Sequence, residues 1–143
     1  EIELRAVHDQ SPWSKQKRAM LTFLHQERKQ WDMMRGFAKS LRLEFPDEED
    51  WWVSEAYATR RAETLDEARK VLLEGLTIHY ESAIIRYNLA CYACLLGSPG
   101  ECMDFLKEAV NRDEKYKTLA LEDEDLELVR EALIKLGWEK KAV

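Results

Sequence analysis

The chain has few residues that break helices and no segment that is typical of a membrane span. Its 143 residues include only five glycines and three prolines. The longest mostly apolar run, 89–96, is far shorter than the roughly 20 residues that a membrane-spanning helix needs. No segment shows the sustained alternation of apolar and polar residues that indicates strands. These absences favour an all-helical protein that does not act in a membrane.

The chain also lacks the basic excess of a nucleic-acid-binding protein. Its net charge is −6, with nine Lys/Arg against six Asp/Glu in 1–46 and thirteen against twenty-two in the remainder. Nucleic-acid binding normally needs a basic domain or a dense basic face, so we expect no nucleic-acid partner. The few cations near the N-terminal end are interpreted as a solvated helix surface: Lys15, Lys17, Arg18, Arg28 and Lys29.

Cysteines are few and odd in number. Three of them cannot all pair within one chain, which favours a reducing compartment, the cytoplasm, over a secreted disulfide scaffold. Cys91 and Cys94 have the spacing of a zinc or redox pair, but no second pair is near. Because both lie in an expected helix, we interpret them and Cys102 as small apolar fillers. No metal or cofactor is predicted.

Motifs for catalysis are missing as well. The sequence has no glycine-rich phosphate loop, no Gly-x-Ser-x-Gly and no His-Glu-x-x-His. His8, His25 and His79 share no telling spacing. The acidic residues 48–50 stand at an expected helix start, where negative charge stabilises the helix dipole. No catalytic residue is predicted, and we expect the chain not to be an enzyme.

Several short segments have the pattern of helix starts. In 98–101, Ser-Pro-Gly-Glu, the serine hydroxyl can accept from a free N–H, proline suits the first helical position and glutamate completes a capping box. Residues 64–67, Thr-Leu-Asp-Glu, follow the same logic, and Ser11-Pro12 opens the first helix similarly. The starts divide the chain into helices of about equal length that come in pairs.

Shifting the sequence by 34 residues aligns these pairs with one another. Small residues fall where two helices would cross closely, and larger apolar residues fall between one pair and the next. A single helical hairpin cannot bury its apolar faces, so such units must stack. The repeated columns are Met34, Ala68 and Cys102, then Ala38, Leu72 and Leu106, then Leu41, Gly75 and Ala109.

At these columns the chain resembles the tetratricopeptide repeat (TPR) family. The best-matching unit carries the segment 87–92, Tyr-Asn-Leu-Ala-Cys-Tyr, followed by Gly97, Cys102, Leu106 and Ala109. The unit before it has Trp52, Ala56, Ala68, Leu72 and Gly75 at similar positions, and the first unit matches at Met34, Ala38, Leu41 and Phe45-Pro46. The chain departs from the family pattern at Glu55, where a large apolar residue is usual, and at Tyr80 and Glu114, where proline is common.

The resemblance implies an all-α stack of antiparallel helical hairpins, a right-handed solenoid of about three units. The units would cover about 15–48, 49–82 and 83–116, and a capping helix at about 123–136 would close the stack. Residues 1–143 would form one such domain.

The resemblance also implies a protein-interaction module, because first helices of stacked hairpins line a concave surface. The partner would be a protein or peptide that binds this apolar and aromatic strip. For the two tyrosines in the strip, ordinary packing between helices is an equally good explanation. The predicted groove residues are Phe23, Val53, Tyr57, Arg60, Ile84, Tyr87, Asn88 and Cys91, with Gln26 and Cys94 beside them.

Some members of this family hold a C-terminal carboxylate with cations on their first helices. Of the matching positions here, only Asn88 suits that role, and a carboxylate needs cationic donors to offset its desolvation. We therefore expect an amphipathic helix or an extended apolar segment as the partner. The other matching positions are Ala19, Phe23, Ser54 and Ile84.

Three other interpretations stay open at this point. The chain can be an accessory or regulatory domain of a larger enzyme, or a metal- or redox-linked protein that uses Cys91 and Cys94. It can associate with itself as a homodimer through Trp51 and Trp52. The N-terminal residues 1–10 can also fill the groove.

Overall fold

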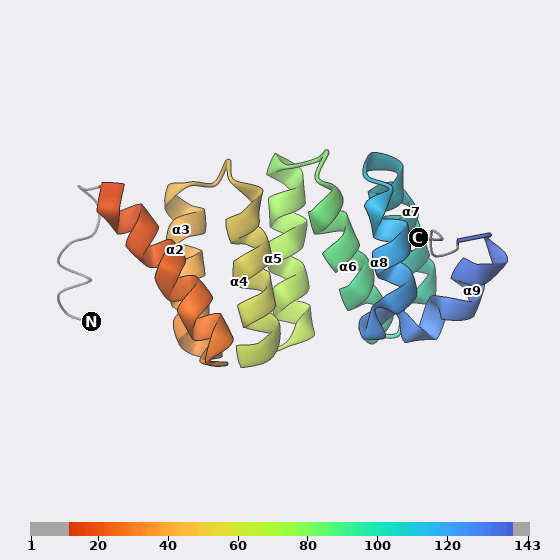
Figure 1. Cartoon of the computed structure of the whole chain (residues 1–143), viewed down its shortest axis with the longest axis horizontal. Coiled ribbons are helices and arrows are strands. Elements are labelled where there is room, and N and C mark those ends of the chain that lie inside the picture. The colour runs from red at the N-terminus through yellow and green to blue at the C-terminus, as the bar shows by residue number, and fades with distance from the viewer. Residues whose placement is uncertain (1–11, 139–143) are drawn as a thin grey trace. The chain divides into compact units, whose positions relative to one another are not determined.

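The computed structural model describes residues 12–138 and is built of helices alone within that range (Figure 1). The all-α fold class is therefore confirmed. No helix among these residues is long and apolar enough to cross a membrane. The elements are α2 (Pro12–Glu27), α3 (Trp31–Glu44), α4 (Glu49–Ala62), α5 (Leu65–Ile78), α6 (Ala83–Leu95), α7 (Pro99–Arg112), α8 (Lys115–Glu122), the 3-10 helix η1 (Glu124–Val129) and α9 (Arg130–Lys135).

The chain divides into two compact units, Glu1–Val71 and Leu72–Val143, and the boundary falls within α5. The pairs α4–α5 and α6–α7 fall in two of the three intervals expected from the 34-residue shift, and the pair α2–α3 begins three residues before the first interval, at Pro12. That residues 1–143 act as one domain stays a prediction.

In the first unit, α3 packs between α2 and α4. Its apolar stripe of Met34, Ala38 and Leu41 is fully buried, as the repeated columns predict. Trp52 of α4 is 2% exposed, and its indole N–H donates to the Pro46 carbonyl at 2.8 Å. The spacing of three and four residues explains why these side chains share one helix face.

Glu55, the departure from the apolar family pattern, is nevertheless buried in this core. Its carboxylate accepts two hydrogen bonds from the Arg42 guanidinium, at 2.9 and 3.0 Å. A buried charge is tolerated when it is paired and hydrogen-bonded, so the departure does not disturb the packing.

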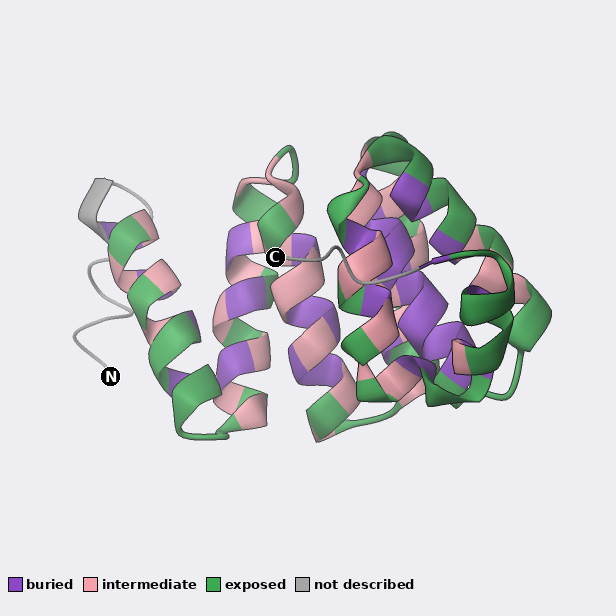
Figure 2. Ribbon diagram, turned by 45° about the vertical axis from the view of Figure 1, so that its right-hand side comes forward, coloured by how far each residue is buried: buried purple, intermediate pink, exposed green. Residues whose placement is uncertain are grey.

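In the second unit, α6 is the central helix. It packs against α7 on one side and against η1 on another. Nine of its thirteen residues are buried, which is why its sequence is apolar around most of its circumference. The core residues there are Ile85, Leu89, Ala90, Tyr92, Cys102, Leu106, Leu126 and Leu133. Figure 2 shows the buried positions along the helices.

The helix starts agree with the sequence in position and differ at one cap. Thr64 Oγ1 accepts from the Glu67 N–H at 3.1 Å, as expected, and Pro99 occupies the first turn of α7. The predicted cap by the Ser98 side chain is wrong, because this hydroxyl forms no capping bond. Its backbone is held instead by the preceding turn, where the Ser98 N–H donates to the Ala93 carbonyl at 2.8 Å.

The C-terminal part differs from the sequence prediction in two ways. Helix α8 was not expected, although Asp113 Oδ1 accepts from the N–H of its first residue, Lys115, at 3.1 Å. The capping segment expected at about 123–136 is a 3-10 helix, η1, followed by the short α9. Asp123 starts η1 by accepting from the Asp125 N–H at 3.0 Å.

Candidate functional site

The eight predicted groove residues are divided between the two units. Phe23, Val53, Tyr57 and Arg60 belong to the first unit, and Ile84, Tyr87, Asn88 and Cys91 belong to the second. We call these two groups of predicted residues the half-site of the first unit and the half-site of the second unit.

The half-site of the first unit is partly open to solvent. The Phe23 side chain on α2 is 63% exposed. Val53, Tyr57 and Arg60 are half-buried and share one face of α4, because their spacing is four and three residues. These positions offer apolar and aromatic surface with a cation at one end.

Tyr57 makes the packing contacts that one of the two interpretations of this residue expects, and its role in binding stays a prediction. Its ring meets the ring of Trp31 edge to face, with centroids 5.6 Å apart. Arg61 lies 5.5 Å from both ring centroids and donates to the Tyr57 hydroxyl at 3.3 Å. Tyr57 thus packs between helices and still presents part of its surface.

The half-site of the second unit is largely covered by the chain itself. Tyr87 and Cys91 are 7% and 3% exposed, and η1 packs on the helix that carries them. The Tyr87 ring is stacked on Tyr116 of α8, with centroids 4.7 Å apart. Ile84 and Asn88 stay half-exposed on the same helix.

Asp123, the residue that starts η1, links this covering segment, η1, to α6. The Tyr87 hydroxyl donates to Asp123 Oδ2 at 2.8 Å, and the Cys91 thiol approaches the same oxygen at 3.7 Å. Burial, with the neighbouring Asp123, raises the pKa of Cys91. Burial is also the main cause of the raised pKa of Tyr87. Both groups are therefore protonated donors to the carboxylate.

The same residues form the one cluster, within 12–138, whose atoms are close enough to share a metal ion. The ligand atoms of Cys91, Asp123 and Asp125 lie within 4.8 Å of one another. The donors already have other bonds: Asp123 Oδ2 accepts from Tyr87, and its Oδ1 accepts from the Asp125 N–H. With no metal bound, burial holds the Cys91 sulfur in its thiol form. The cluster is a hydrogen-bonded link.

The Cys91–Cys94 pair does not converge on that cluster. Cys94 interacts with Cys102 of α7 instead, and burial together with Cys94 raises the pKa of Cys102 to about 12. All three cysteines are free and buried. Their environment agrees with the interpretation of small apolar fillers.

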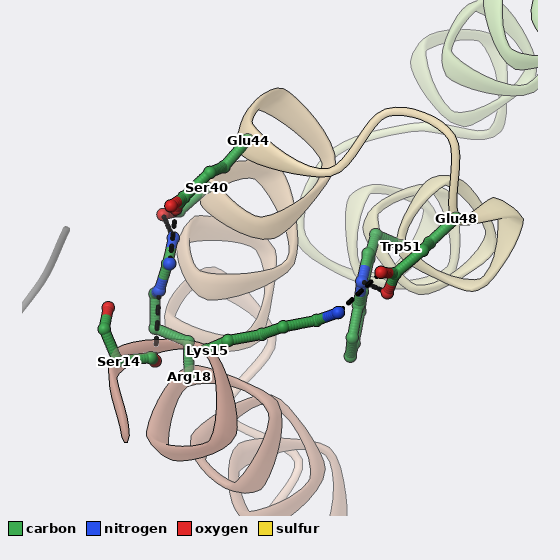
Figure 3. A network of polar contacts seen from close by, with 7 residues as sticks. All are labelled: Ser14, Lys15, Arg18, Ser40, Glu44, Glu48 and Trp51. Atoms are coloured by element: carbon green, nitrogen blue, oxygen red, sulfur yellow. Dashed lines mark hydrogen bonds and ion pairs between the residues drawn. The ribbon is translucent and has the colours of Figure 1, made fainter. Parts of the chain in front are cut away.

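Helix α2 carries a feature that the sequence analysis missed: its buried face is polar. Ser14, Arg18, Thr22 and His25 are all less than 9% exposed. The Arg18 guanidinium donates to the Ser14 carbonyl at 3.2 Å and to Ser40 Oγ at 2.7 Å, and it pairs with Glu44 (Figure 3). The spacing of four, four and three residues places these side chains on one helix face, but a polar face at this spacing is normally solvated.

Three large apolar residues of α2 are exposed on its other side. Met20 is 70% exposed, Phe23 is 63% exposed and Leu24 is 38% exposed. They line an open hollow of about 600 Å³ on this helix, together with Lys17, Ala19 and Leu21. The helix therefore has reversed polarity, because apolar side chains normally form the buried stripe.

The basic residues near the N-terminal end are not all solvated. Lys15 pairs with Glu48 at 2.5 Å, and Glu48 accepts from the Trp51 indole N–H at 2.9 Å (Figure 3). Trp51 is half-buried and Trp52 is buried, so the Trp pair does not form an exposed aromatic surface. Whether the chain forms a homodimer stays untested.

Comparison with known proteins supports the fold of the chain but assigns it to no family. No protein-family model matches the chain, and no curated protein matches its sequence. Among solved structures, it is similar to PcrH in complex with the chaperone binding region of PopB. The TM-score is 0.64 at 12% identity, over 88% of this chain and 96% of that chain. This likeness supports a TPR-like helical fold, whereas membership of the repeat family stays a prediction.

Proposed function

We propose that the chain is a protein-interaction module that binds a peptide or helical segment of another protein, as an adaptor, chaperone or assembly factor. One observation carries the proposal. The fold is similar, over most of both chains, to PcrH bound to the chaperone binding region of PopB. A fold alone does not transfer a function, so the exposed residues of the chain must supply the chemistry.

The half-site of the first unit supports this proposal best. Val53, Tyr57 and Arg60 present apolar, aromatic and cationic groups on one face of α4, and Phe23 is well exposed on α2. Aromatic residues and arginine are the types that contribute most at protein interfaces. In the second unit, Ile84 and Asn88 would contact the partner. Tyr87 and Cys91 are buried and would instead hold Asp123 in place beneath the binding surface.

The proposed partner segment is largely apolar and is not a carboxylate terminus. The positions that would hold a carboxylate include Ala19, Phe23 and Ile84, which carry no donor. We place the module in the cytoplasm, because three free, buried cysteines suit a reducing compartment. A catalytic role, a nucleic-acid partner and a membrane role are not part of the proposal.

The test is affinity capture of binding proteins with the full chain and with Tyr57→Ala, followed by mass spectrometry. We expect a partner that the native chain retains and the variant loses, because Tyr57 supplies a rigid aromatic contact. The matched control is Tyr80→Ala, which removes a tyrosine that is 66% exposed outside the half-sites. Circular dichroism checks that each variant is helical. A partner retained equally by all three chains contradicts the proposed half-site.

A further inference from the structure

The reversed polarity of α2 has a physical consequence. A surface helix normally buries its apolar stripe and exposes its polar face. Here Arg18 and Thr22 are buried, while Met20 and Phe23 are among the most exposed large apolar residues within 12–138. We call the exposed set Met20, Phe23 and Leu24 the α2 apolar face. Clustered exposed apolar residues of this kind mark interaction sites.

The geometry of the α2 apolar face suits inserted side chains. Positions 20, 23 and 24 are neighbours on a helix surface. The hollow of about 600 Å³ over them is open to solvent, and the described residues that line it all come from α2. Apolar side chains of a partner can pack on such an open apolar face.

The cations around the α2 apolar face indicate the charge of a molecule that binds there. Lys17 lines the hollow, and Arg28 and Lys29 follow the helix at its C-terminal end. The ion pairs described between residues 12 and 138 involve none of these three cations, whereas Lys15 and Arg18 are paired with Glu48 and Glu44. On α2 itself, Glu27 is the single carboxylate.

We propose that the α2 apolar face binds an amphipathic segment of another protein that carries apolar and acidic side chains. The apolar side chains fill the hollow over Met20 and Phe23, and the carboxylates pair with Lys17 at one end and Arg28 at the other. This inference rests on the proposed protein-binding function and names the chemistry of the partner. Charge complementarity then sets the choice of partner and its orientation.

The probes are two synthetic helical peptides with the same leucine stripe, one with glutamate and one with lysine at the remaining positions. Fluorescence anisotropy measures their binding to the full chain. We expect the glutamate peptide to bind at least tenfold more tightly than the lysine peptide. Met20→Asp should weaken that binding at least tenfold, and Lys17→Glu should reduce the preference for the glutamate peptide, because Arg28 and Lys29 remain.

The control variant is Leu43→Asp, which places the same charge at an apolar residue of α3 that is 62% exposed. It should leave the binding of both peptides unchanged. Circular dichroism shows whether each variant is folded. Equal binding of the two peptides, or binding of the glutamate peptide that Met20→Asp does not weaken, overturns the proposal.

Two further outcomes identify another occupant and also overturn the proposal. If the native chain is a dimer that takes up no peptide and Met20→Asp makes it monomeric in sedimentation, the occupant is a second copy. If the glutamate peptide binds only after removal of residues 1–11, the occupant is that segment of the chain.

The failure of this inference differs from failure of the proposed function. A captured partner that Tyr57→Ala loses and Met20→Asp retains leaves the function standing and removes the α2 apolar face from it.

Discussion

The Arg42 guanidinium and the Glu55 carboxylate form a two-point ion pair inside the first unit. Arg42 Nε donates to Glu55 Oε1 at 2.9 Å, and Nη2 donates to Oε2 at 3.0 Å. Their side chains are only 12% and 4% exposed. Arg42 also lies over the Trp52 ring, 4.7 Å from its centroid. The pair therefore holds α3 and α4 together at the point where the family pattern has an apolar residue.

Removing one partner of this pair should be costly. Glu55→Ala leaves the Arg42 charge buried and unpaired, so we expect the free energy of unfolding to fall by about 3–5 kcal/mol. Urea denaturation measures the change. The double variant Arg42→Met/Glu55→Leu should lie much closer to the native chain, because it removes both buried charges and keeps apolar volume.

The control for this prediction is Lys70→Ala. It breaks the exposed pair of Lys70 and Glu67, whose side chains are 71% and 47% exposed. Exposed pairs contribute little, so the change should stay within about 0.5 kcal/mol. An equal effect of Glu55→Ala and Lys70→Ala would show that the buried pair has no special role.

Asp123 should control access to Cys91. Asp123→Ala removes the acceptor of the Tyr87 hydroxyl and the cap of η1, so we expect a loss of about 2–3 kcal/mol in the free energy of unfolding. The covering segment then opens more often, and iodoacetamide should modify Cys91 faster than in the native chain. Mass spectrometry of the digested chain resolves the rate at each cysteine.

The matched control for Asp123 is the neighbouring exposed carboxylate Glu124. Glu124→Ala should change the alkylation of Cys91 little, because the residue has no described bond to α6. In the native chain Cys91 should react slowly, since it is buried and burial raises its pKa. Fast modification of native Cys91 would contradict this account of the second half-site.

The columns of the 34-residue repeat predicted most of the fold, because helix pairs of this kind depend on local residue spacing. Met34, Ala38 and Leu41 are buried as the 34-residue columns require, and the expected helix pairs are present. The repeat also placed Tyr87 and Cys91 on one face of α6. It did not predict their burial, because the contacts that cover them come from later in the chain: Asp123 at the start of η1, and Tyr116 of α8.

Tertiary partners explain what local patterns missed. The Glu55 column predicted an apolar residue, and only the position of Arg42, thirteen residues earlier, explains the carboxylate. Likewise, Arg18 of α2 resembles a surface cation in the sequence, and it is buried because Ser40 and Glu44 of α3 bind it. Such long-range pairs leave no periodic signal.

The Lys15–Glu48 pair should make stability depend on pH. The hydrogen bond from Lys15 is the main cause of the lowered pKa of Glu48, against its ordinary value of 4.5. A carboxyl group whose pKa is lower in the folded state stabilises the fold above the unfolded pKa and loses this contribution as pH falls through the folded pKa. Stability at neutral pH should therefore fall on Glu48→Gln, and the difference should vanish in acid.

Urea denaturation of the native chain and Glu48→Gln between neutral pH and strong acid measures this difference. Lys15→Gln supplies the control, because in its background the same substitution should have a smaller effect that depends less on pH. If the difference in stability between the native chain and Glu48→Gln grew as pH falls, the Lys15–Glu48 pair would not be its cause. High salt should reduce the difference, since both side chains are about 40% exposed.

Two glycines should respond to alanine with opposite signs. Gly97 ends α6 with φ +83°, and its N–H and that of Ser98 donate to the Cys94 and Ala93 carbonyls, the arrangement of a Schellman cap. A Cβ at Gly97 would meet no atom within 4 Å, so any cost comes from the backbone alone. We expect Gly97→Ala to lower the free energy of unfolding by about 1 kcal/mol.

Gly36 is the matched control, because it lies exposed within α3 and a Cβ there also meets nothing within 4 Å. Alanine favours a helix interior, so Gly36→Ala should raise the free energy of unfolding by about 0.5–1 kcal/mol. Thermal or urea unfolding of the two variants gives both signs in one experiment. Because neither substitution adds a contact, equal signs would mean that the backbone at Gly97 is not held in the left-handed region that the cap requires.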